Sequence, residues 1–153
     1  MAELDEAAIV ELTAVKLLAS REHSRHELRR KLAARHLADD LIDAVLEGLE
    51  QRGLLSDARF VESYVTQRSR KGYGPLRIRA ELAERGVAGE VVADWLDQGA
   101  IDWAERLDEV AARKFGDLPA GDARDLARRG RFLEQRGFPI SLVRRYIDRV
   151  RHF

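Results

Sequence analysis

The side chains best suited to binding a partner surround a short glycine-rich stretch, Lys71-Gly72-Tyr73-Gly74-Pro75. Tyr73 lies between two glycines, outside any apolar helical stripe, and Arg70, Lys71 and Arg77 are its basic neighbours in the sequence. An aromatic ring among cations can stack on a nucleic-acid base or fill a pocket of a protein partner. The other interpretation is a tyrosine that folds back over the loop and closes a joint between two helices.

A metal site would need the histidines of the chain to gather with other ligands. His23 and His26 are three residues apart and could in principle face one metal ion. Only Glu22 and Glu27 lie nearby as further ligands, and the pair straddles Ser24, where a helix is expected to begin. We therefore expect no metal site.

The patterns of common catalytic sites are also missing from the sequence. Lys71 lies beside glycines, but the phosphate-binding loop requires Gly-Lys-Ser/Thr at the start of a helix that follows a strand. The chain contains no cysteine that could act as a nucleophile and no Gly-x-Ser-x-Gly elbow, and its carboxylates occur in charge-rich runs. These observations predict a protein that is not an enzyme.

The composition suits a helical protein with a large charged surface. Of the 153 residues, 45% are hydrophobic and 35% are charged, and the formal net charge is zero. No uncharged apolar run reaches the roughly 20 residues that span a membrane, and the first residues are acidic, unlike the basic start of a signal peptide. We expect a cytoplasmic monomer that does not bind membranes.

The zero net charge conceals alternating blocks of opposite charge along the chain. Residues 21–35, 68–85 and 124–151 are mainly basic, whereas residues 37–50 and 90–109 are mainly acidic. One interpretation is attraction between neighbouring helices, and the other is an extended body with a basic face and an acidic face. The sequence leaves both interpretations open.

The chain repeats itself at intervals of 50 and 51 residues, which indicates an array of similar units. The shared pattern Leu-x-x-Arg-Gly-apolar-x-x-x-apolar-x-x-x-aromatic-apolar begins at Leu82 and again at Leu133. In the first copy His36 stands where the other two copies have Gly86 and Gly137. Because a non-glycine residue rarely adopts a positive φ, we expect a different angle at the first elbow.

Each copy is expected to contain three helices, with repeat one over about 6–53, repeat two over about 57–98 and repeat three over about 101–151. No segment alternates with the period of two that marks a strand. A unit of roughly 45 residues buries little surface on its own, so neighbouring copies must share faces. The predicted fold is all-α, with three tandem three-helix repeats in one elongated, curved body.

Local signals predict several helix ends and core positions. Ser24 and Glu27 form a capping-box pattern before the second helix of repeat one. Pro75 fits the first position of a helix, while Gly72 and Gly74 can supply the positive φ of a sharp turn. The first helix, over about 6–20, is expected to place its stripe and flank at Ile9, Leu12, Val15, Lys16 and Leu18. Core aromatics are expected at Trp95, Phe132, Phe138 and Tyr146.

Four segments, taken in chain order, carry a resemblance to a known family. They are Ser24-Arg25-x-Glu27-Leu28-Arg29-x-Lys31-Leu32, Leu54-Leu55-Ser56-Asp57-x-Arg59-Phe60, Lys71-Gly72-Tyr73-Gly74-Pro75-x-x-Ile78-Arg79-x-Glu81-Leu82 and Phe132-Leu133-x-x-Arg136-Gly137-Phe138. These segments resemble motifs of RecX, the bacterial regulatory proteins that act on the RecA recombinase. The resemblance covers nearly the whole chain, apart from the acidic first ten or so residues.

The resemblance implies a helical-repeat protein that lies in the groove of the RecA–DNA filament. It further implies modulation, mainly inhibition, of RecA's ATP hydrolysis, strand exchange and co-protease activity in DNA repair, recombination and the SOS response, without enzymatic activity or a cofactor. We expect the main filament-facing patch to consist of Arg25, Arg29, Arg30, Arg70, Lys71, Tyr73, Arg77 and Arg79. Charge reversal at Arg77 and Arg79 is then expected to weaken RecA inhibition without unfolding the protein.

Two other functions compete with this interpretation. The basic blocks are compatible with an autonomous DNA-binding module, although zero net charge argues against strong binding that depends on neutralised phosphates. Direct contact with DNA inside a RecA complex is also possible. The other competing function is that of a helical-repeat adaptor for an unrelated protein.

Overall fold

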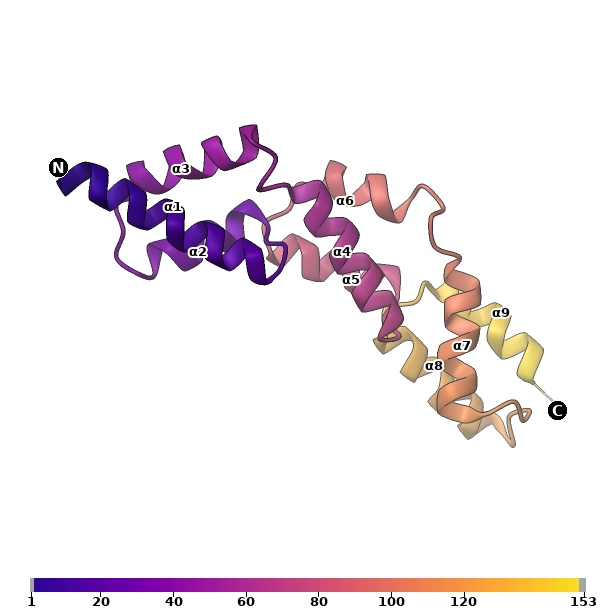
Figure 1. Cartoon of the computed structure of the whole chain (residues 1–153). Coiled ribbons are helices and arrows are strands. Elements are labelled where there is room, and N and C mark those ends of the chain that lie inside the picture. The colour runs from indigo at the N-terminus through magenta and orange to yellow at the C-terminus, as the bar shows by residue number, and fades with distance from the viewer. Residues whose placement is uncertain (1, 152–153) are drawn as a thin grey trace. The chain divides into compact units, whose positions relative to one another are not determined.

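The computed structural model describes the backbone of residues 2–151 and the side-chain surroundings of residues 6–151. This part of the chain consists of helices and connecting loops without a strand, as Figure 1 shows, so the all-α prediction is confirmed. The helices are α1 (Ala2–Ser20), α2 (Arg25–Ala33), α3 (Asp39–Gln51), α4 (Asp57–Arg70), α5 (Pro75–Glu84), α6 (Gly89–Leu96), α7 (Trp103–Phe115), α8 (Ala123–Gln135) and α9 (Ile140–Val150).

Two of the predicted helix starts have the chemistry expected from the sequence. Ser24 adopts an extended conformation and caps α2, and the reciprocal bonds with Glu27 complete the capping box. Pro75 is the first residue of α5, where its missing N–H leaves no intrahelical bond unmade. The first helix begins at Ala2 rather than near residue 6.

The chain folds into two compact units. The first holds the residues up to Ser63 together with Leu82–Val92, and the second holds Tyr64–Glu81 together with the residues from Ala93 onward. The segment predicted as repeat two therefore contributes to both units.

The first unit is built around α1, α2 and α3, which pack against one another (Figure 1). Its core side chains are each 0–2% exposed: Val10, Ala14, Leu28, Leu32, Ile42, Leu46, Leu49 and Leu55. The stripe predicted for α1 is wrong at Ile9 and Leu12, which are 53% and 56% exposed, whereas Leu18 packs against the core as expected. Helix α1 carries apolar residues on more than one side, and the side with the small Ala14 is the one that packs into the core.

The second unit has its own core where α7, α8 and α9 meet. The buried side chains there are Leu107, Ala111, Leu133, Phe138, Val143 and Tyr146. Phe138 and Tyr146 confirm the prediction of core aromatics, whereas Phe132 and Trp95 are only half-buried. The guanidinium of Arg129 is buried beside this core and donates to the Tyr146 hydroxyl over 3.0 Å.

The three elbow residues all have a positive φ. His36 has φ 62°, close to the 74° of Gly86 and within the same left-handed region as the 100° of Gly137. His36 therefore adopts a positive φ although it is not a glycine, and a different angle between the helices at the first elbow stays a prediction. Gly86 needs to be glycine for a further reason, because an added Cβ would lie 2.4 Å from Cγ of His26.

His23 is a buried titratable side chain of the first unit. Its Nδ1 lies 3.1 Å from the carbonyl oxygen of Arg21, and its Nε2 lies 2.9 Å from Nζ of Lys31. Since an ammonium can only donate, Nε2 accepts and the ring is neutral. Burial lowers the pKa of His23 from 6.5, and the charges of Arg21 and Lys31 act in the same direction.

We expect the first unit to lose stability as the pH falls below about 6.5, because the unfolded chain then binds a proton that folded His23 resists. Denaturation followed by far-UV circular dichroism between about pH 5 and pH 7 would measure this loss. His23→Gln should flatten the dependence, whereas His36→Asn, at an exposed position, should leave it unchanged. Equal pH dependence in wild type and His23→Gln would contradict the assignment.

Candidate partner-binding site

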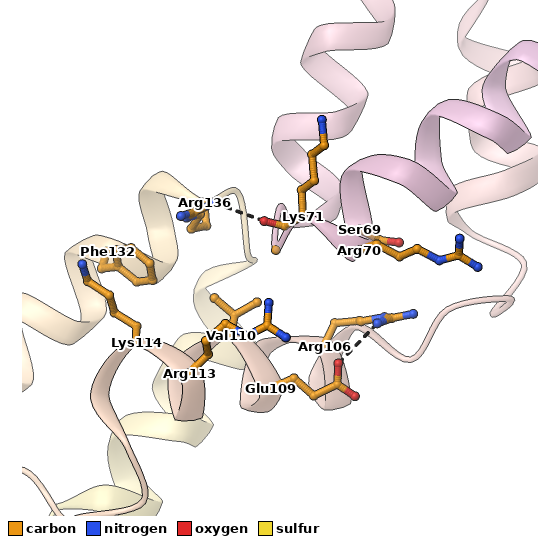
Figure 2. A pocket seen from close by; sticks show the side chains of 11 residues that line it. Ser69, Arg70, Lys71, Arg106, Glu109, Val110, Arg113, Lys114, Phe132 and Arg136 are labelled. Carbon is orange, nitrogen blue, oxygen red and sulfur yellow. Dashed lines mark hydrogen bonds and ion pairs between the residues drawn. The ribbon is translucent and has the colours of Figure 1, made fainter. Parts of the chain in front are cut away.

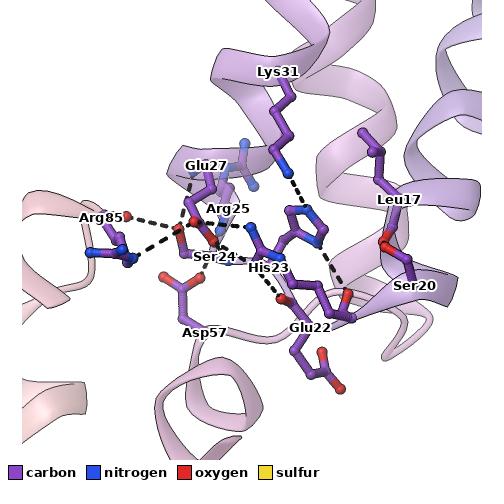
Figure 3. Close-up of polar contacts among 11 residues, drawn as sticks. Leu17, Ser20, Glu22, His23, Ser24, Arg25, Glu27, Lys31, Asp57 and Arg85 are labelled. Atoms are coloured by element: carbon purple, nitrogen blue, oxygen red, sulfur yellow. Dashed lines mark hydrogen bonds and ion pairs between the residues drawn. The ribbon is translucent and has the colours of Figure 1, made fainter. Parts of the chain in front are cut away.

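The first unit contains a polar joint at the start of α2, drawn in Figure 3. The Ser24 hydroxyl donates to the carbonyl oxygen of Arg85 over 2.8 Å and accepts a hydrogen bond from the amide of Glu27 over 3.1 Å. The amide of Arg25 donates to Oδ1 of Asp57 over 2.8 Å. These bonds fasten the start of α2 to segments about 30 and 60 residues away in the sequence.

The three predicted site residues on α2 differ in how they are engaged. Arg29 donates to Asp43 over 2.8 Å, a hydrogen bond that lowers the pKa of the Asp43 carboxyl. Arg25 is paired with Glu50. Arg30 is exposed, forms no ion pair within the described residues, and lines a shallow groove with His26 and Lys31. Exposed ion pairs contribute little to stability, so Arg25 and Arg29 can exchange their partners at low cost.

The second unit contains a backbone joint around the glycine-rich loop. The amide of Gly74 donates to the carbonyl oxygen of Arg136 over 2.7 Å, and the amide of Leu76 donates to that of Gly137 over 2.9 Å. An added Cβ on Gly74 would lie 2.6 Å from the backbone of Gly137. Gly72 has the predicted positive φ, but Gly74 does not. Gly74 is instead required by the close approach of two backbone segments.

Tyr73 lies half-buried over this joint rather than projecting from it. The guanidinium carbons of Arg68, Arg77 and Arg136 lie 3.9, 4.3 and 4.8 Å from the centre of its ring. Such cation–π contacts are each worth about 0.5–2 kcal/mol, depending on exposure. This placement matches the sequence interpretation in which the tyrosine closes the joint between helices.

Glu81 is the charged centre of the same joint. It accepts two hydrogen bonds from Arg68, over 2.9 and 2.7 Å, one from the Tyr64 hydroxyl over 2.8 Å and one from Arg77 over 3.3 Å. Partial burial opposes the charged form, but the hydrogen bonds from Arg68 and Tyr64 outweigh it and lower the pKa of Glu81. Arg77 therefore belongs to the joint, whereas Arg79 pairs with Asp97 over 2.9 Å.

A basic cavity of about 240 Å³ lies beside the end of α4 in the second unit. Figure 2 shows Arg106 and Arg113 rising from α7 toward the end of α4, where Arg70 lies. The full lining consists of Ser69, Arg70, Lys71, Gly72, Arg106, Glu109, Val110, Arg113, Lys114, Phe132 and Arg136. We call this hollow the basic cavity.

The structure divides the eight predicted site residues into distinct settings. Arg25, Arg29 and Arg30 belong to the first unit, and the other five belong to the second. Arg70 and Lys71 line the basic cavity, Tyr73 and Arg77 lie in the joint, and Arg79 is paired separately. Four further basic residues of the cavity were not identified as site residues from the sequence: Arg106, Arg113, Lys114 and Arg136. Arg106 falls within a mainly acidic block, and the spacing of Arg106 and Arg113 on one helix was the available signal.

Two other kinds of site have no support in the described residues. Nowhere in that part of the chain do three or more histidine, aspartate or glutamate side chains gather as metal ligands do. No helix there is long and apolar enough to cross a membrane.

Comparison with protein families matches the chain in three consecutive segments. Residues 12–49 match the first three-helix domain of RecX, residues 56–96 the second and residues 101–147 the third. The solved structure of RecX from Lactobacillus salivarius has a TM-score of 0.81, with 21% identity over 96% of this chain and 97% of that chain. At that identity the likeness shows the fold.

Relatives with higher identity bear the name "Regulatory protein RecX". The protein of Pseudomonas savastanoi pv. phaseolicola is 49% identical over 95% of this chain and 94% of its own length. That of Pseudomonas syringae pv. tomato is 48% identical over 96% of this chain and 95% of its own length. With three matching domain models and such close relatives along almost the whole sequence, the chain belongs to the RecX family of regulatory proteins.

Proposed function

We propose that this protein binds the RecA nucleoprotein filament and inhibits RecA's ATP hydrolysis, strand exchange and co-protease activity. Through these effects it would act in DNA repair, recombination and the SOS response, as a cytoplasmic monomer without a catalytic role of its own. The observation that carries the proposal is membership of the RecX family, with relatives 48–49% identical along almost the whole chain.

The proposal is tested by RecA's ATP hydrolysis on single-stranded DNA, with this protein titrated well below one molecule per RecA. A fall in the rate at such ratios is expected, because one bound molecule affects several RecA subunits when filament growth stops or disassembly begins. An unchanged rate, even with excess protein, would contradict RecA as the partner.

Among the seven basic residues of the expected contact patch, the ones without a carboxylate partner are the best candidates for filament contact. In the described chain these are Arg30, Arg70 and Lys71. Each of Arg25, Arg29 and Arg79 would first have to release its carboxylate partner before it could contact the filament. Charge reversal at Arg77 would change the stability of the joint as well as RecA binding, since Arg77 also contacts Tyr73 and Glu81.

Charge reversal at Arg70 and Lys71 is expected to weaken RecA inhibition about tenfold or more, the effect of losing roughly 1.4 kcal/mol of binding free energy. Both side chains are exposed, so the double variant Arg70→Glu/Lys71→Glu should fold normally. The matched control is Arg124→Glu/Arg144→Glu, which makes the same charge change at two other exposed positions of the second unit. If RecA inhibition fell equally in both variants, the cause would be the change in net charge, and the proposed contact would be contradicted.

An autonomous DNA-binding module remains the second candidate, and the basic cavity is the observation that favours it. This second candidate function predicts a measurable affinity for DNA in the absence of RecA, and that affinity should fall steeply with added salt. The formal net charge of zero limits that affinity.

A further inference from the structure

The basic cavity collects positive charge that the protein itself does not neutralise. Its basic residues are Arg70, Lys71, Arg106, Arg113, Lys114 and Arg136, and the acidic side chain in the lining is Glu109. Glu109 pairs with Arg106 over 3.3 Å. None of the other five forms an ion pair within the described residues, in contrast to the nearby Arg68, which pairs with Glu81 over 2.7 Å.

Like charges around one hollow repel each other, and the repulsion is stronger where the walls partly exclude water. Val110 and Phe132 contribute apolar walls. The loop approaches α7 closely, because an added Cβ on Gly72 would lie 3.2 Å from Cγ2 of Val110. A bound anion would remove the repulsion and gain from every cation that it contacts.

The arrangement of the cations favours one kind of anion. They come from different sides of the hollow: Arg70 from the end of α4, Arg106 and Arg113 from α7, and Arg136 from the residue after α8. A carboxylate offers two oxygens in one plane, whereas a tetrahedral phosphate presents oxygens in several directions. Guanidinium groups also match phosphate oxygens with paired hydrogen bonds.

We propose that the basic cavity binds a phosphate group. The group comes either from a phosphodiester of a DNA strand or from a free phosphate compound, and both would use the same contacts. This inference deepens the second candidate function, on which its phosphodiester source rests, and it goes beyond the RecA proposal because all the lining residues lie in the second unit and none belongs to RecA.

The test uses the purified full chain without RecA and two probes. The first is a fluorescent oligothymidylate of about 15 nucleotides, a length within the range that single-strand binding sites cover. Its binding is followed by anisotropy at low and increasing salt. The second probe is inorganic pyrophosphate, whose binding is followed by NMR of the arginine side-chain N–H groups.

The informative variant is Arg106→Gln/Arg113→Gln, which removes two cavity charges and keeps side chains of similar length. We expect the oligonucleotide affinity to fall about tenfold and the salt slope to decrease by about one, as expected when one or two phosphate contacts are lost. The control Arg124→Gln/Arg144→Gln removes two exposed charges outside the cavity lining and should bind like wild type. Far-UV circular dichroism checks that both variants remain helical.

Each outcome decides the proposal. Loss of oligonucleotide binding in the cavity variant alone supports a phosphodiester ligand, while pyrophosphate binding without oligonucleotide binding supports a free phosphate compound. If neither probe binds wild type, or if the cavity variant and the control lose binding equally, the phosphate site is refuted. Because RecA is absent, this result is independent of the RecA proposal.

Discussion

Replacing Gly137 with alanine is expected to lower the free energy of unfolding of the second unit by about 3 kcal/mol or more. Gly137 has φ 100°, a conformation that alanine adopts only with strain. The new Cβ would also lie 2.4 Å from Cβ of Arg77 and 2.6 Å from its backbone nitrogen. Relief of that contact would pull apart the joint in which Leu76 donates to Gly137 over 2.9 Å.

Urea denaturation followed by tryptophan fluorescence would measure this loss, because Trp95 and Trp103 both lie in the second unit. Gly99→Ala is the matched control, since Gly99, also in the second unit, has φ 74° but no atom within 4 Å of an added Cβ. This control substitution should lower the free energy of unfolding only by the backbone strain, about 1 kcal/mol. Equal destabilisation by the two substitutions would show that the close approach at Gly137 contributes nothing.

The second large effect is expected at Glu81, where Glu81→Gln should destabilise the second unit by about 2 kcal/mol. The substitution removes the charge that receives two hydrogen bonds from Arg68, both partners being less than 20% exposed. It also leaves Arg68 and Arg77, two of the arginines around Tyr73, without the carboxylate that both contact. Asp97→Asn breaks a single, more exposed pair with Arg79 and should cost less than about 0.5 kcal/mol.

The pH dependence of stability gives an independent test of Glu81. Its pKa is lowered from 4.5 in the folded protein, so the folded state holds the charged form more readily than the unfolded chain does. The resulting stability is present above pH 4.5 and is lost as the pH falls through the folded pKa. Glu81→Gln should flatten this acidic loss in a tryptophan-detected titration, and an unchanged slope would mean that another carboxylate is responsible.

The local features of the fold could be predicted from the sequence because each depends on a few neighbouring residues. Ser24 with Glu27, Pro75 and the glycines at the elbows act on the backbone next to them. The face of α1 that enters the core could not be predicted. Apolar residues lie on several sides of that helix, and packing against α2 and α3 selects Val10 and Ala14 over Ile9 and Leu12.

The candidate site was predicted only where its residues are close in sequence. Arg70 and Lys71 were found from the glycine-rich loop, but the cavity also takes Arg113 from α7 and Arg136 from beyond α8. Neither sequence spacing nor block charge shows which distant helices approach the loop. The role of Gly74 illustrates the same limit, because its requirement arises from the backbone of Gly137, 63 residues away.

Regulation of RecA through its filament requires that this protein bind RecA-coated single-stranded DNA more tightly than bare single-stranded DNA, and a comparison of the two affinities measures this. The chain has no cysteine, so an Ala44→Cys variant at an exposed position of α3 can carry one fluorescent label. We predict at least about tenfold tighter binding to the RecA filament at physiological salt. Equal or weaker binding to the filament would contradict RecA as the partner.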